Sequence, residues 1–115
     1  LIAYATLAKD MARAVYYVKK VADGYLAERR VDKKLMEALL LSLEIYKFAY
    51  SLYTKLDLNL CSEIKARYLK IRQMLDSASV YHYEVRRLAS YGVAIMDDIL
   101  NIYLVPPKTQ ALNRS

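Results

Sequence analysis

The sequence predicts an all-α protein, an antiparallel four-helix bundle, from two observations. Apolar residues recur every three or four positions almost from end to end of the 115 residues, which is the spacing of one face of an α-helix. Only two glycines and two prolines occur in the chain, too few for the turns of an all-β fold. Hydrophobic residues are 57% and charged residues 26% of the chain, a balance typical of a folded domain.

The first predicted helix carries one apolar seam that we expect to face the core. Its members alternate in steps of four and three residues, and they are Tyr4, Ala8, Met11, Val15, Val18, Ala22 and Tyr25. The charged run at 28–30 predicts a turn after this helix.

The second helix is predicted at 33–56, with Asp32 as its N-cap. Its apolar residues cover most of its circumference, and its polar stripe is narrow. Such a helix either lies centrally in the bundle or uses one side to bind another subunit.

A turn at 57–62, capped by Asn59 or Ser62, leads into an apolar seam that runs from Ile64 to Tyr103. Residues that favour caps and turns cluster at 76–79, so we predict two helices with a break near 77–79. One continuous helix, giving three helices in all, is the alternative. Prolines at 106 and 107 end the last helix. We therefore expect a bundle domain at 1–105 and a polar C-terminal tail at 106–115.

No catalytic, metal-binding or cofactor motif is recognisable, and we predict a protein that is not an enzyme and has no small-molecule substrate. His82 is the only histidine, and we expect it to be packed or half-buried. Cys61 is expected to act as a small hydrophobic residue. Adjacent Asp97 and Asp98 point about 100° apart on a helix, and we expect them on a solvated face.

Twelve tyrosines are the least ordinary feature of the composition. Those on or beside the seams are expected to lie mostly in the core: Tyr4, Tyr25, Tyr46, Tyr50, Tyr53, Tyr68 and Tyr103. Some of the others should face outward, where tyrosine suits interfaces: Tyr16, Tyr17, Tyr81, Tyr83 and Tyr91.

The net charge of +6 points to a polyanionic partner, with nucleic acid as the first candidate and an acidic membrane surface as the second. The basic residues cluster in two segments, and the candidate nucleic-acid-binding residues are Arg29, Arg30, Lys33, Lys34, Lys65, Arg67, Lys70, Arg72, Arg86 and Arg87. If the last two helices fold back on each other, Arg67, Lys70, Arg86 and Arg87 can line one surface. Because no pattern for reading bases is present, we expect sequence-independent contact with the backbone of double-stranded DNA.

The helical pattern from Tyr4 to Tyr103, the tyrosines and the basic runs ERRVDKK and KARYLKIR resemble the coat proteins of filamentous viruses of thermophilic archaea. Scarce Asn, Gln and Cys agree with a heat-adapted source. The resemblance implies a bundle subunit that coats double-stranded DNA, located in a virion or the host cytoplasm and not secreted. The chain begins at Leu1 rather than Met, so we expect further residues upstream.

Two functions are therefore expected. The first is a structural protein that self-associates through its second helix and binds DNA without sequence specificity. The alternative is a small helical protein–protein interaction module, or a subunit of a larger nucleoprotein complex. A membrane span is not expected, because no stretch approaches about 20 apolar residues.

Overall fold

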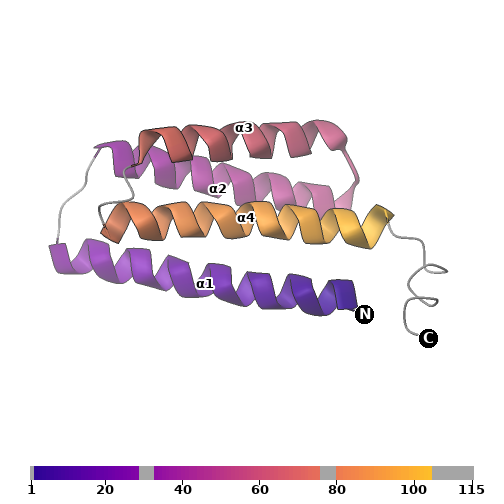
Figure 1. Ribbon diagram of the computed structural model, residues 1–115, viewed down its shortest axis with the longest axis horizontal. Coiled ribbons are helices and arrows are strands. Elements are labelled where there is room, and N and C mark those ends of the chain that lie inside the picture. Colours follow the sequence, from indigo (N-terminus) through magenta and orange to yellow (C-terminus); the bar gives the residue numbers. More distant parts are fainter. Residues whose placement is uncertain (1, 29–32, 76–79, 105–115) are drawn as a thin grey trace.

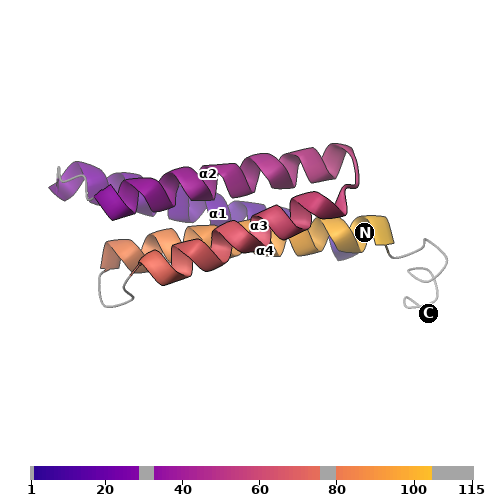
Figure 2. The same ribbon diagram turned by 90° about the horizontal axis from the view of Figure 1, so that it is seen from above.

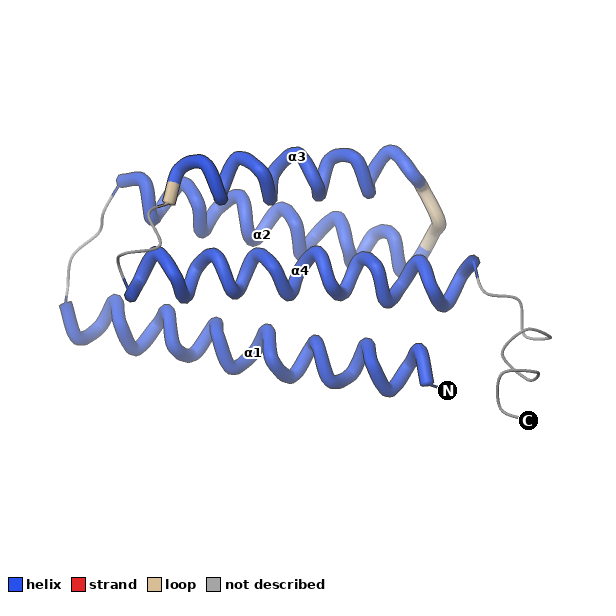
Figure 3. The backbone as a smooth tube through the Cα atoms, in the orientation of Figure 1, coloured by secondary structure: helices blue, strands red, loops and turns tan. Residues whose placement is uncertain are grey.

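The computed structural model describes residues 2–28, 33–75 and 80–104, and it confirms the predicted all-α fold. Four helices follow one another within the described residues: α1 (Ile2–Glu28), α2 (Lys33–Thr54), α3 (Leu58–Met74) and α4 (Val80–Leu104). The helices lie side by side with their axes roughly parallel, and the chain direction reverses from each helix to the next (Figures 1 and 3). None of these helices is both long and apolar enough to cross a membrane.

The helix ends follow from local chemistry. Asp57, not Asn59 or Ser62, caps α3, because its carboxylate accepts a hydrogen bond of 2.9 Å from the backbone N–H of Asn59. Leu75 has an extended backbone after Met74, so α3 and α4 are separate helices and the three-helix alternative is wrong. The predicted cap Asp32, the break at 77–79 and the tail at 106–115 lie outside the described residues.

Three of the helices form a closed group, and α1 stands beside them. The backbones of α2, α3 and α4 all approach one another, whereas α1 approaches α4 alone. Among the described residues, no Cα atom of α1 lies within 8 Å of a Cα atom of α2 or α3. The view from above places α3 in front and α1 behind (Figure 2).

The core lies mainly between α2, α3 and α4, and Leu7 and Ala14 of α1 belong to it as well. Its largest fully buried side chains include Ile45, Leu52, Ile64, Ile71 and Met96. The seam predicted from 64 onwards is confirmed over most of its length, because its members on α3 and α4 are largely buried. Gly92 brings α4 close to α2, since a Cβ atom there would meet Cγ2 of Ile45 at 2.5 Å.

The prediction that the apolar seam from Tyr4 to Tyr25 forms the core face of α1 is wrong. Its members, here called the outer seam, are all exposed, and Val15 retains 69% of its accessible surface. The buried face of α1 is formed by the residues that each precede a member of the outer seam by one position, and it is here called the inner seam. This inner seam packs toward α4, and it consists of Ala3, Leu7, Asp10, Ala14, Tyr17, Val21 and Gly24. Because α1 meets one helix only, one flank of its broad apolar arc is left uncovered.

The assignment of the tyrosines is also largely wrong. Most of those expected in the core are exposed, namely Tyr4, Tyr25, Tyr50, Tyr53 and Tyr103. Tyr46 and Tyr68 are half-buried. The Tyr46 hydroxyl donates a 2.6 Å hydrogen bond to the backbone carbonyl of Leu88, and burial raises the pKa of this phenol. The expectation that some of the remaining tyrosines face outward is confirmed by Tyr16 and Tyr83, which are exposed, whereas Tyr17, Tyr81 and Tyr91 are half-buried.

Replacing Gly92 by Ala is expected to destabilise the protein, because the added methyl group would meet Ile45 at 2.5 Å. Overpacking costs about 1–3 kcal/mol, and the better helix propensity of alanine offsets only about 1 kcal/mol. Gly24→Ala is the matched comparison, because its methyl group would meet the ring of Tyr81, which is half-buried and lines the groove, whereas Ile45 is fully buried in the core. The denaturant midpoint should fall more for Gly92→Ala, and the opposite ranking would contradict this packing.

Candidate functional site

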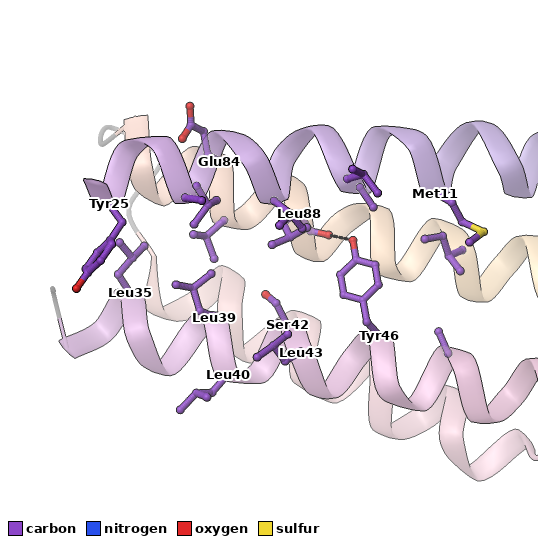
Figure 4. Close-up of a pocket in the computed structure, with 18 of the residues that line it drawn as sticks. Met11, Tyr25, Leu35, Leu39, Leu40, Ser42, Leu43, Tyr46, Glu84 and Leu88 are labelled. Carbon is purple, nitrogen blue, oxygen red and sulfur yellow. Dashed lines mark hydrogen bonds between the residues drawn. The ribbon is translucent and has the colours of Figure 1, made fainter. Parts of the chain in front are cut away.

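An open apolar groove of about 1110 Å³ lies between α1 and α2, with α4 as its floor. Figure 4 shows Leu35, Leu39 and Tyr46 of α2 pointing into the space below α1. Among the described residues that line the groove, Glu84 is the only one with a carboxylate, ammonium or guanidinium group. The groove therefore offers apolar contact rather than acid–base chemistry.

The dimensions of the groove suit a helix better than a small molecule. Its wall on α1 extends from Leu7 to Tyr25, which is roughly 27 Å at 1.5 Å per helical residue. Small-molecule pockets usually enclose about 300–1,000 Å³ and bury most of the ligand. A long open groove between two helices is instead the shape in which an apolar helix docks.

Both rims of the groove carry exposed apolar side chains. On α1 these are the outer seam, in which Met11, Val15 and Val18 are each more than half exposed. On α2 they recur at helical spacing on the side away from the core: Met36, Leu40, Leu43, Tyr50 and Tyr53. Lys47 interrupts this row. Helix α2 thus packs against α3 and α4 and still presents an apolar side without a partner in the described part of this chain.

An aromatic cluster attaches α1 to α4. The ring of Tyr17 stacks on that of Tyr91 with 5.6 Å between centroids. The Arg87 guanidinium donates a 2.6 Å hydrogen bond to the Tyr91 hydroxyl and lies 4.9 Å from the centre of that ring. Hydrogen bonding to Tyr17 raises the pKa of Arg87. Arg87 therefore ties the two helices together.

A second polar contact between α1 and α4 joins Asp10 and Asp98. The expectation that Asp97 and Asp98 both lie on a solvated face is therefore wrong for Asp98. Asp97 is exposed as expected, but Asp98 keeps only 7% of its accessible surface. Burial, a hydrogen bond with Asp10 and the charge of that residue raise the pKa of Asp98 from 3.8 to about 7. Oδ2 of Asp98 is buried without a hydrogen-bond partner, which costs less for a neutral carboxyl than for a carboxylate. Arg13 lies 3.8 Å from Asp10 on the exposed side.

The four basic residues predicted to line one surface do not do so. Arg67 bonds at 2.5 Å to both Glu44 and Glu63, and Lys70 lies 3.6 Å from Glu37. These contacts place Arg67 and Lys70 on the flank of α3 that faces α2. Arg87 belongs to the α1–α4 contact, and Arg86 points about 100° away from it around the same helix.

The other candidate basic residues have different surroundings. Lys65 and Arg72 are exposed, and they lie seven residues apart on the flank of α3 opposite Arg67. The Arg72 guanidinium lies 5.8 Å from the ring centre of Tyr68. Lys33 and Lys34 are exposed on the first turn of α2. Arg29 and Arg30 lie outside the described residues.

His82 and Cys61 occupy the packed positions that the sequence predicts. His82 is half-buried and lines one end of the groove. Cys61 is buried in the core, and burial raises the pKa of its thiol. Within the described ranges, His, Cys, Asp and Glu form no group of three that could hold a metal ion.

The groove is the feature that the sequence pattern did not predict. Its signal was present as two neighbouring heptad rows on α1, one starting at Ala3 and one at Tyr4. Two rows form an apolar arc wider than one helix–helix contact needs.

Comparison with protein-family models, with curated proteins and with solved structures finds no match to this chain.

Stability is expected to fall as pH rises from about 4 to about 7. Over this range the folded protein keeps a proton on Asp98 that the unfolded chain has lost, because the folded pKa is about 7 and the ordinary value is 3.8. Asp98→Asn, which keeps a neutral side chain able to bond Asp10, should remove this contribution. Denaturant midpoints at pH 5 and pH 8 measure the effect.

The exposed neighbour provides the control for this experiment. Asp97→Asn removes the same charge from the same turn of α4 and should leave the difference between the two pH values unchanged. If Asp98→Asn leaves the pH dependence of stability unchanged, the raised pKa of Asp98 is contradicted.

Proposed function

We propose that this chain is a non-enzymatic structural protein that self-associates by burying the apolar surface of α1 and α2. The observation that carries the proposal is the outer seam of α1, a row without charged residues that is exposed beside an open apolar groove. Heptad spacing of four and three residues is the pattern by which one helix packs along another.

The energetics of this surface favour association. Monomeric soluble proteins rarely expose contiguous apolar patches larger than a few hundred Å². Here the rims of the groove include side chains such as Val15, at 69% exposure, and Leu40, at 54%. Full burial of an exposed aliphatic or aromatic side chain contributes about 1.5–3 kcal/mol, so a few of these residues would offset the entropy cost of association.

Binding to nucleic acid is the second candidate activity. The observation that favours it is the pair Lys65 and Arg72, which share one flank of α3 and form no ion pair with any carboxylate in the described part of the chain. With a net charge of +6, such a flank suits contact with phosphates. Self-assembly with non-specific DNA binding is the role implied by the resemblance to coat proteins of filamentous archaeal viruses.

Leu40→Glu is expected to weaken self-association, because it places a charge on the rim of the groove. Leu69→Glu is the matched control, since Leu69 lies on α3 with 55% exposure against 54% for Leu40. Sedimentation equilibrium over a range of concentrations should give oligomers for the wild type and for Leu69→Glu, and mainly monomers for Leu40→Glu. A wild-type protein that is monomeric throughout would overturn the proposal and favour a module that binds a different protein.

For the second candidate, the double change Lys65→Ala with Arg72→Ala should flatten the salt dependence of binding to a 30-base-pair DNA duplex. Every phosphate that the variant no longer neutralises reduces the slope of log K against log salt by about 0.9. Lys70→Ala, which removes a cation already paired with Glu37, should change the slope less. Fluorescence anisotropy at several salt concentrations measures the slopes, and equal slopes for all three proteins would exclude this flank of α3.

A further inference from the structure

The two heptad rows of α1 have different roles in the fold. The inner seam is occupied by α4, through contacts such as Leu7, Ala14 and the Tyr17 stack on Tyr91. The outer seam begins one residue later and faces open space beside the groove. Most of its members line the groove, namely Met11, Val15, Val18, Ala22 and Tyr25.

The order of residue sizes along the outer seam is suited to an antiparallel copy of itself. In antiparallel helix pairs, the two positions of the heptad seam face each other across the interface, an arrangement that differs from the like-with-like layers of parallel pairs. Centred between Val15 and Val18, this register places Ala8 opposite the partner's Tyr25, Met11 opposite the partner's Ala22, and Val15 opposite the partner's Val18. Each layer thus combines a large side chain with a small one, or two of medium size, as dense packing requires.

A parallel copy would pack less well. It would place Tyr25 against the partner's Tyr25 and Ala8 against the partner's Ala8, which alternates crowded layers with empty ones. The row of exposed apolar residues on α2 is a weaker candidate for a two-fold contact, because Lys47 interrupts it between Leu43 and Tyr50.

Charge does not oppose the antiparallel pair. The positions that border the outer seam on its open side include Ala5, Ala12 and Lys19. In the antiparallel register Lys19 comes beside the partner's Ala12, so the two lysines stay apart. The pair is isologous, because the same row serves both copies, and it closes after two subunits.

We propose that two copies of this chain pair antiparallel through the outer seam of α1, each helix α1 entering the groove between α1 and α2 of the other copy. This inference rests on the proposed self-association and adds its interface, direction and register. The apolar rim of α2, including Leu40 and Leu43, would then cover the far side of the partner's α1.

Disulfide cross-linking tests the register. In a Cys61→Ala background, we would mix Ala8→Cys protein with Tyr25→Cys protein of different tag length and oxidise the mixture. A cross-linked species of mixed size is expected, because residues 8 and 25 face each other across the pair. Each variant alone should remain uncross-linked, since two copies of residue 8 would lie 17 residues, roughly 25 Å, apart along the helices.

A neighbouring position on α1 provides the control for this cross-link. Lys9→Cys, next to Ala8 but on another side of α1, should not cross-link with Tyr25→Cys. Cross-linking of Ala8→Cys with itself would show parallel pairing and overturn the inference. If the wild type sediments as an oligomer but the mixture gives no cross-link, this interface is wrong while the proposed self-association stands. If the wild type is monomeric, both fail.

Discussion

Among the helices that the structure describes, α4 alone holds α1, and the position of the candidate site depends on how that contact fixes the rotation of α1. The buried row of α1 carries two polar attachments, Asp10 against Asp98 and Tyr17 against Arg87 and Tyr91. Rotating α1 by one residue would bury Tyr4, Ala8 and Met11 but would separate these partners. The polar contacts therefore keep the outer seam turned away from α4 and the groove open.

The core formed by α2, α3 and α4 also includes Leu7 and Ala14 of α1. Ile45, Ile64 and Val85 are fully buried among these three helices, and Gly92 lets α2 and α4 approach closely. Because α1 approaches α4 and not α2, an open groove separates α1 from α2, and core residues such as Val85 and Ile99 line it. The apolar side chains that remain on α1 and α2 are then available to another chain, which connects the fold to the proposed assembly.

The sequence predicts the helices well and the site poorly, for physical reasons. Periodicity identifies a helix with one solvent-exposed face, so the helical segments of α3 and α4 were predictable from the seam beginning at Ile64. Their separation was predictable from the residues at 76–79 that favour caps and turns. On α1 two apolar rows lie side by side, and periodicity does not say which one meets another helix. Asp10 and Asp98 resemble surface residues in the sequence, because their hydrogen bond joins two helices that are far apart in the chain. Likewise the charge count includes Arg67 and Lys70, although glutamates on α2 and α3 already bind them.

Pairing and nucleic-acid binding would reinforce each other, since a pair of copies would present the Lys65 and Arg72 flank of α3 twice to one polyanion. The central claim, that the outer seam of α1 is the surface that associates, is tested most directly by methyl NMR over a dilution series. Signals of Met11, Val15 and Val18 should shift or broaden as concentration rises, while those of Leu69 on α3 stay constant. Signals of the outer seam that are independent of concentration, or changes confined to α3, would contradict the claim.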